Sequence, residues 1–209
     1  DLIRSRGLGD VYKRQANTTG VSNTALGNES LPNNTTGQDD VAVGDKAMFE
    51  NTSGDGNTAV GREALMHNTT ADSNTAVGYH AMRTNTTGGN NVAIGYQALY
   101  TGIVGNTVAI GYKALYANGD TGYNNTAVGY LSLTANTTGD SNTALGRESL
   151  EANTGGTGNT ALGKAAMHAN TTGATNVAVG FNAMEQNTTG SHNTAVGDGA
   201  LNANTTASN

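Results

Sequence analysis

Apolar and polar residues follow one fixed order along this chain, repeated many times. A five-residue string close to Asn-Thr-Ala-Val-Gly occurs eleven times at a constant interval, except that one interval is a single residue short and the next is a single residue long. The unit reads N-T-A-V-G-x-x-A-L-x-x-N-T-T-G-x-x, and we number its positions one to seventeen from the first Asn. One unit buries too few apolar side chains to fold alone, so the units must stack into a solenoid. The glycines at position five are Gly27, Gly44, Gly61, Gly78, Gly95, Gly111, Gly129, Gly146, Gly163, Gly180 and Gly197.

Positions one to five predict a short β-strand. Position two is Thr or Val in every copy, position three is always Ala, and position four is always Val, Leu or Ile. Side chains alternate along a strand, so positions two and four should share one face, with Asn, Ala and Gly on the other. The invariant glycine at position five indicates a positive φ angle or a very close backbone approach.

Positions six to eleven look different, because helix-forming residues dominate there and the adjacent apolar pair at eight and nine does not alternate. We expect one helical turn at these positions, with a second short strand as the alternative. The Asn-Thr-Thr-Gly that follows is typical of a turn. The predicted fold is therefore a β-solenoid, a parallel β-roll of eleven coils of about 17 residues, with a column of Val, Leu and Met inside.

Residues 1–15 (DLIRSRGLGDVYKRQ) share none of this pattern. They are similar to the translated adapter sequences found at the edges of assembled environmental sequences, and a natural basic tail is the alternative. We exclude them from the fold and assign 16–209 to the repeat solenoid. Solenoids need polar capping units, and neither end of the array has one, so we expect the array to be truncated at both ends.

Composition and charge remove several classes of function. Hydrophobic residues make up 35% of the chain, less than a single large core needs, and no run approaches the roughly 20 apolar residues of a membrane span. Four of the ten basic and two of the sixteen acidic residues lie in 1–15, which leaves six against fourteen for the repeats. We therefore expect no nucleic-acid partner and no membrane insertion. The absence of cysteine excludes disulfides and thiolate metal sites.

The units N-T-A-V-G and N-V-A-I-G, the second at residues 91–95, resemble the head repeats of trimeric autotransporter adhesins. Similar arrays occur in phage and giant-virus tail fibres. The resemblance covers 16–209 and implies a left-handed parallel β-roll, a homotrimer and attachment to a host surface protein or glycan. The unit departs from the adhesin repeat in being longer, with added Leu or Met and Asn-Thr-Thr.

Tyrosines are the one regional anomaly, and stacked coils should align them in a ladder. The ladder is either a contact surface for sugars or proteins or, as we favour, a set of rings that cover one another. Its members are Tyr79, Tyr96, Tyr112 and Tyr130 at position six and Tyr100 and Tyr116 at position ten.

The remaining polar residues suggest no singular site. The Asn-Thr-Thr turns could carry N-linked glycans or present threonines to ice, but we expect their asparagines to stack and cap the turn. The four histidines fall at unrelated positions of the unit, so we expect no metal site. The aspartates at the end of each unit, Asp39, Asp55, Asp72 and Asp140, are expected to be solvated.

These observations predict a structural and adhesive rod from an extracellular, cell-surface or virion fibre, without enzymatic activity or cofactor. The alternative is a solenoid that binds ice or glycan. Both strand faces are restricted to small or aliphatic residues, whereas an exposed face should drift toward large charged residues. We therefore expect a homo-oligomer, and the resemblance implies a trimer. The alternative is that Ala and Gly are kept small by a tight turn within one chain.

Overall fold

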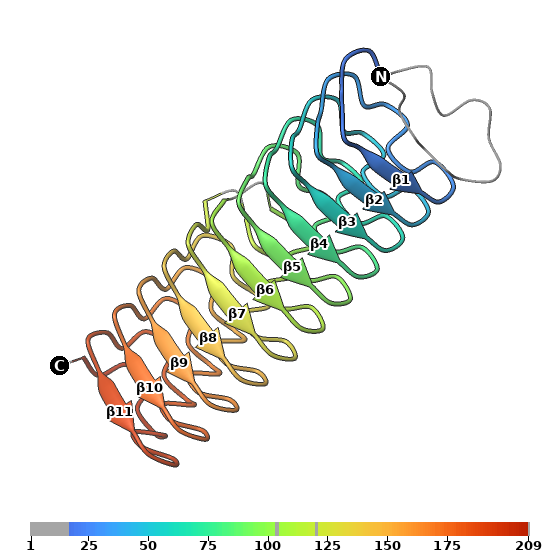
Figure 1. The fold of residues 1–209 in the computed structure, drawn as a ribbon. Helices are drawn as coiled ribbons and strands as arrows, with labels where there is room; N and C mark the ends of the chain where they lie inside the picture. Colours follow the sequence, from blue (N-terminus) through green and yellow to red (C-terminus); the bar gives the residue numbers. More distant parts are fainter. Residues whose placement is uncertain (1–16, 103–104, 120, 209) are drawn as a thin grey trace. The chain divides into compact units, whose positions relative to one another are not determined.

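The computed structural model describes residues 17–102, 105–119 and 121–208, so the non-repeat segment 1–15 lies outside the described residues. The chain divides into two compact units, Asp1–Gly105 and Asn106–Asn209, and the described residues of each form a stack of coils with one strand per coil (Figure 1). The first unit contains β1 (Thr24–Leu26), β2 (Val41–Val43), β3 (Thr58–Val60), β4 (Thr75–Val77) and β5 (Val92–Ile94). The second contains β6 (Val108–Ile110), β7 (Thr126–Val128), β8 (Thr143–Leu145), β9 (Thr160–Leu162), β10 (Val177–Val179) and β11 (Thr194–Val196).

Within each unit, neighbouring strands are parallel and pair between identical positions of the repeat. Ala59 of β3 lies opposite Ala42 of β2 and Ala76 of β4, and Ala144 of β8 lies opposite Ala127 and Ala161 in the same way. Each coil therefore advances the chain by one repeat and one strand. The prediction of a β-solenoid whose coil is one repeat long is confirmed.

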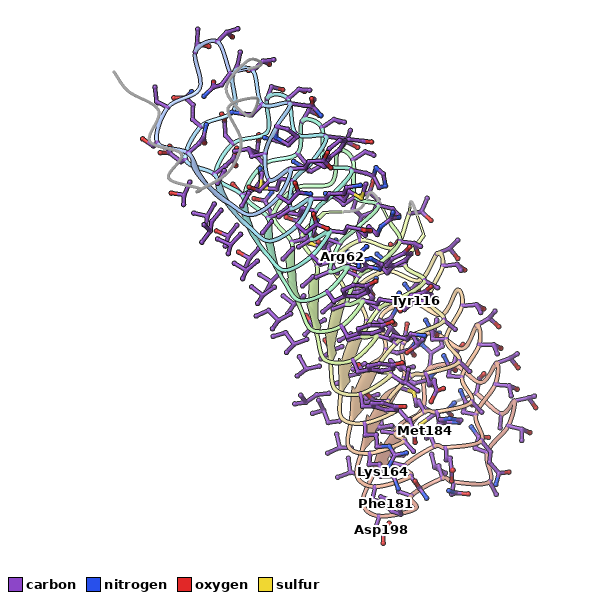
Figure 2. All side chains as sticks on the ribbon, turned by 90° about the vertical axis from the view of Figure 1, so that its right-hand side faces the viewer. Arg62, Tyr116, Lys164, Phe181, Met184 and Asp198 are labelled. Atoms are coloured by element: carbon purple, nitrogen blue, oxygen red, sulfur yellow. The ribbon has the colours of Figure 1, made fainter. Side chains whose placement is uncertain are left out.

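The strands turn their alanine inward and their aliphatic residue outward. In β5, Ala93 is 0% exposed, whereas Ile94 at position four is 39% exposed. The two faces are divided as the alternation predicts, but the expected inner column of Val, Leu and Met is wrong for position four. The interior consists of Ala, Leu or Met, and Asn, while Thr or Val at position two and an aliphatic residue at position four stand on the outside of the strands. Figure 2 shows short side chains projecting from that outer face. We call positions two and four the strand face, for example Thr58 and Val60.

Positions six to eleven form turns, and the expectation of a helical turn is wrong. The described residues contain no helix and no second strand in these positions. The reason is the alternating sign of φ: Lys46 at position seven has a φ of 55° and Met48 at position nine a φ of 49°, and the same two positions are positive in the other coils. A helix requires successive residues with the same negative φ.

The turns are held by hydrogen bonds to neighbouring coils. The N–H groups at positions seven, nine and eleven donate to carbonyls of the adjacent coils, as Lys46 does to Asn28 (2.9 Å), Met48 to Ala64 (3.0 Å) and Glu50 to Met66 (2.9 Å). Because positions seven and nine are both left-handed, the apolar side chains at positions eight and nine both point inward. Ala47 and Met48 are accordingly fully buried. A left-handed Leu or Met costs about 1–2 kcal/mol, which burial of its side chain at about 1.5–3 kcal/mol offsets.

Glycine at position five is required by both of the reasons expected from the sequence. Gly61 has a φ of 134°, and a Cβ placed on it would lie 2.5 Å from the carbonyl oxygen of Gly78 in the next coil. Any side chain there would separate the coils at the end of the strand.

Two columns of asparagine run through the interior. At position twelve, the Asn153 Nδ2 donates to the Asn136 Oδ1 (2.9 Å) and to the Gly156 carbonyl (3.1 Å), and its own Oδ1 accepts from Asn170 (2.9 Å). At position one, the Asn57 Oδ1 accepts the N–H of Asn74 (3.0 Å). The predicted stacking of the asparagines in the Asn-Thr-Thr turns is confirmed. We call the position-twelve column the Asn ladder.

Candidate functional site

Charged and aromatic side chains are concentrated on one surface of the coils. We call this surface the turn face; it consists of positions six, seven, ten and eleven, for example Arg62, Glu63, Met66 and His67 in one coil. By contrast, the strand face carries no charged residue in any copy. All six basic residues of the repeats lie on the turn face: Lys46, Arg62, Arg83, Lys113, Arg147 and Lys164.

In the first unit, position six forms a continuous column of complementary side chains. The Asn28 Nδ2 donates to Asp45 Oδ1 (2.8 Å), and the Arg62 Nε lies 3.5 Å from Asp45 Oδ2. The Arg62 guanidinium in turn lies 5.9 Å from the centre of the Tyr79 ring. Tyr79 stacks on Tyr96 with ring centres 5.5 Å apart and planes within 8°.

The second unit repeats this arrangement with the cation on the other side of the rings. Tyr112 and Tyr130 stack with centres 5.2 Å apart, and the Arg147 guanidinium lies 5.6 Å from the Tyr130 ring. Further along the chain, Lys164 lies over Phe181 at 5.1 Å, and Figure 2 shows both at the same edge of their coils. Cations at these distances attract the ring faces.

The structure places the six predicted tyrosines on the turn face, four in the position-six columns and two beside them. Tyr100 and Tyr116 at position ten are half-buried, and the Tyr100 hydroxyl lies 3.5 Å from Arg83 Nη1. The ammonium of Lys113 lies 5.1 Å from the Tyr116 ring and 5.6 Å from the Tyr112 ring. Within each unit the ring faces lie against another ring or a cation. This geometry favours mutual covering over the stacking of sugars.

A cluster of ionisable groups interrupts the simple columns in the first unit. Glu63 lies at its centre: its Oε2 accepts from Arg83 Nε (2.7 Å), and its Oε1 lies 3.3 Å from Arg62 Nη2. The His80 Nε2 lies 2.9 Å from the same Oε2, and the His80 ring stacks on Tyr79 at 3.7 Å. Within the described residues neither ring nitrogen of His80 makes a hydrogen bond of acceptable geometry.

These contacts shift the protonation equilibria of the cluster. The hydrogen bond from Arg83, with further attraction from His80 and the two arginines, lowers the pKa of Glu63. Burial lowers the pKa of His80, an effect that Glu63 opposes and the two arginines reinforce. The cluster therefore holds a carboxylate, two guanidinium groups and a largely neutral imidazole at neutral pH.

Pairs of acidic and basic residues between coils were missed in the sequence because histidines were compared only with one another. Three of the four histidines stand one repeat after a glutamate: His67 lies 3.0 Å from Glu50, His80 2.9 Å from Glu63, and His168 3.3 Å from Glu151. Lys46 and Arg62 likewise follow Glu29 and Asp45 by one repeat. A search for an acidic residue one repeat before each Lys, Arg or His would have found all five pairs.

The aspartates at the end of the unit have a structural role that the sequence did not predict. The Asp55 Oδ1 accepts the N–H of Gln38, and the Asp72 Oδ1 accepts the N–H of Asp55, both at 2.8 Å. Asp140 accepts the N–H of Tyr123 at 2.9 Å in the second unit. These carboxylates, exposed at Asp55 and Asp72 and half-buried at Asp140, therefore cap the coil before them. No group of three or more potential metal ligands occurs among the described residues.

Comparison of the chain with protein-family models, with curated proteins and with solved structures found no match. Within the described part of the chain, no helix is long and apolar enough to cross a membrane.

Proposed function

We propose that this chain is a structural and adhesive rod segment of an extracellular, cell-surface or virion fibre that mediates attachment to a surface. The observation that carries the proposal is the contrast within each coil between a repeated interior and a variable turn face. A repeated interior holds the coils together, while all basic residues of the repeats, most of the acidic ones and nearly all aromatic rings lie on the turn face, where they vary from coil to coil. The resemblance to adhesin and tail-fibre repeats supports the same role, and the proposal assigns no catalysis to this segment.

Attachment is tested by measuring binding of the chain to an array of host-matrix proteins and glycans. The test variant carries Tyr96→Gln and Tyr130→Gln, which remove one ring from each position-six stack. Thr138→Ser at an exposed corner is the matched control. We expect at least a tenfold loss of binding for the double variant and none for the control. Failure of the wild-type chain to bind any surface would refute the adhesive role.

A homo-oligomer, a trimer by resemblance, is part of the proposal. Its support is the strand face, where Ile94, Leu145 and Val196 are 39%, 49% and 69% exposed without any charge nearby on that face. An exposed antiparallel or edge surface normally carries charges that prevent association. Three such faces meeting at a common axis would bury these side chains.

The strand face alone is too narrow for a stable pairwise interface. Two outward side chains span about 7 Å along a strand, and the six strands of the second unit extend about 29 Å at the spacing of parallel strands. The resulting area of roughly 200 Å² is far below the ~800 Å² per partner of a stable interface. Association must therefore include further surface of the coils, and the choice of a trimer rests on the resemblance.

Sedimentation equilibrium decides the oligomeric state. We expect the wild-type chain to associate, and Leu145→Thr with Leu162→Thr to weaken association at least tenfold without changing the circular dichroism spectrum. Thr143→Ser, on the same face, is the control. A monomer at micromolar concentration that melts cooperatively would contradict the proposal.

The second candidate function is ligand binding by the strand face, because that face displays threonine hydroxyl and aliphatic methyl groups at the regular spacing of parallel strands. Such an array could order a repeating ligand such as ice. A thermal-hysteresis measurement tests it, and Thr143→Val with Thr160→Val should abolish any activity found. Glycan binding is tested by the array described above.

A further inference from the structure

Sequons for N-linked glycosylation coincide with the Asn ladder. The sequence Asn-x-Thr or Asn-x-Ser marks an asparagine as a glycan acceptor, and such sequences normally occur in surface loops. Here the repeat places one at position twelve of most coils. In the first unit the acceptors include Asn34, Asn51, Asn68 and Asn85. In the second unit they include Asn136, Asn170 and Asn187.

These seven asparagines are between 0% and 2% exposed. Their Nδ2 atoms, to which a glycan would be attached, are already engaged. The Asn68 Nδ2 donates to Asn51 Oδ1 (2.8 Å) and to the Ala71 carbonyl (3.1 Å), and the Asn187 Nδ2 donates to Asn170 Oδ1 (2.8 Å) and to the Gly190 carbonyl (3.0 Å). The interior beside them has no room for an added group, since a Cβ on Gly190 would lie 2.4 Å from Asn187 Oδ1.

We infer that the folded solenoid and an N-linked glycan at a buried position twelve are mutually exclusive, and that only exposed sequon asparagines outside the Asn ladder can accept a glycan freely in the folded chain. Three such residues occur, namely Asn28 in Asn-Glu-Ser, and Asn33 and Asn124 in Asn-Asn-Thr. The Nδ2 atoms of Asn28 and Asn33 donate to Asp45 Oδ1 and to the Phe49 carbonyl (both 2.8 Å), but both asparagines are exposed, so water can replace these bonds. This inference rests on the interior of the coils and is independent of what the rod binds.

The chemistry of transfer explains the conflict. The donor is a lipid diphosphate-linked oligosaccharide. A bond forms between Nδ2 and the sugar C1, the bond from C1 to the donor phosphate breaks, and one amide proton leaves with the released lipid diphosphate. At a ladder asparagine, the modification would remove one of the two Nδ2 hydrogens, of which one donates to the neighbouring coil and the other to a carbonyl three residues on in the same coil, and it would force the sugar between the coils. A chain modified before folding would therefore be unable to close its coils at that position.

The incompatibility of a position-twelve glycan with the folded coils limits where the proposed fibre can be made. A fibre secreted through a compartment that glycosylates unfolded chains would receive glycans at position twelve before the ladder forms. The design therefore fits an extracellular or virion fibre that is made where no such transferase acts on the nascent chain.

The experiment uses the full chain, a purified oligosaccharyltransferase and a lipid-linked oligosaccharide, with site occupancy measured by mass spectrometry of glycopeptides. Native chains are compared with chains held in the lowest urea concentration that unfolds them, at which transfer to a short sequon peptide is first shown to proceed. We expect occupancy at the seven buried asparagines to be at least tenfold lower in the native chain than in the unfolded chain, while the three exposed sites are occupied in both. A native chain with these ladder asparagines occupied as in the unfolded chain would overturn the inference.

A matched variant separates the glycan from the sequence change. The variant replaces the hydroxyl residue at position fourteen by Ala in all seven coils concerned, which removes each sequon but leaves the ladder asparagine intact. The residues replaced are Thr36, Ser53, Thr70, Thr87, Thr138, Thr172 and Thr189. Position fourteen is exposed, and Gly155 stands there naturally in one coil. After treatment of the unfolded chain with enzyme, we expect the variant to refold at its original melting temperature and the glycosylated wild type not to refold. Refolding of wild type that carries a glycan on a buried ladder asparagine would also overturn the inference.

Discussion

Positions six and twelve both stack side chains from coil to coil, yet they tolerate different residues. Position twelve is Asn in ten of eleven copies, whereas position six holds Asn, Asp, Arg, Tyr, Lys and Phe. The Asn ladder is buried, and each side chain there must donate to one neighbour and accept from the other, which an amide alone does at that size. The position-six column is exposed, so each residue needs only a neighbour that complements it, such as Arg62 between Asp45 and Tyr79.

The comparison shows that stacking by itself does not determine which residue type occupies a position of the repeat. Burial determines it, because a buried polar group without its partner costs the full desolvation energy, whereas water replaces a lost partner at the surface. Substitutions in the interior should therefore be far more costly than substitutions in the position-six column.

The largest effect is expected for Asn153→Ala in the Asn ladder. It removes a donor to Asn136 and Gly156 and an acceptor for Asn170, and leaves these buried groups unsatisfied. We expect a loss of about 3–4 kcal/mol in the free energy of unfolding, measured by urea titration. Thr138→Ala at the exposed corner is the control, with a change below about 0.5 kcal/mol. A loss no larger than that of the control would contradict the contrast between the columns.

A natural exception in the interior supplies the second test. Position one is Asp40 in one coil where most copies have Asn. It accepts the N–H of Asn57 (2.8 Å) and lies 3.1 Å from Asn51 Nδ2. Burial raises its pKa from 3.8 to about 7, and the charges of Asp55 and Asp72 add to this while the hydrogen bonds from Asn57 oppose it.

The sign of the pH dependence follows from this shift. Between about pH 4 and pH 7 the folded chain binds more protons at Asp40 than the unfolded chain does, so this residue makes stability fall as pH rises, until the effect levels off above pH 7. Asp40→Asn should therefore stabilise the chain by on the order of 3 kcal/mol at pH 8 and much less at pH 5. Stability is measured for wild type and variant by thermal unfolding at each pH. Because the lowered pKa of His80 makes stability rise with pH in both chains, this contribution cancels when the variant is compared with wild type. A difference independent of pH would show that Asp40 titrates normally.

Overpacking of the interior should have the next largest effect. Ala93 is fully buried between coils, so Ala93→Leu should destabilise the chain by about 1–3 kcal/mol. Gln97→Leu, on the turn face, should change stability by less than about 0.5 kcal/mol, since Leu131 occupies the same position in another coil. Equal shifts in melting temperature for the two variants would refute the assignment of the faces.

The smallest effect is expected in the position-six column. Tyr130→Asn removes a ring that stacks on Tyr112 and lies under Arg147, and Asn28 shows that asparagine fits this position. We expect a loss of about 1 kcal/mol, and raising the salt concentration should change it little. Thermal unfolding followed by circular dichroism is sufficient to measure it; a loss as large as that of Asn153→Ala would remove the distinction between the columns.

The repeat explains why much of this fold was predictable from the sequence. The spacing of Gly27, Gly44 and Gly61 predicted the coils and the parallel register, and invariant Ala93 and its equivalents marked one face of the strand as tightly packed. The inward face could not be deduced from alternation alone, because both faces are small or aliphatic. The narrow interior of the folded coil has room for Ala93 but not for Ile94, and this decides which face of the strand points inward.

The turn face was less predictable because its structure depends on the sign of the φ angle at each position and not on side-chain propensity. Arg62, Glu63 and Ala64 favour a helix in isolation, but Glu63 adopts a φ of 55° once its N–H donates to Asp45 of the preceding coil. The tyrosine columns followed from the period, whereas the Glu63 cluster combines positions six, seven and ten and therefore needed the three-dimensional structure.

The hydrogen bonds between coils also determine how such a rod would respond to force. In the coil that begins at Asn57, N–H groups along the strand, the turn and the corner, among them those of Thr58, Leu65 and Thr69, donate to the following coil. A pulling force along the chain loads this ring of bonds at the outermost coil first, so coils should detach one at a time. Each detachment frees one repeat, which is roughly 50 Å of extended chain. Stretching would then produce a regular series of equal force peaks, and the rod would absorb work in small steps while the remaining coils stay intact.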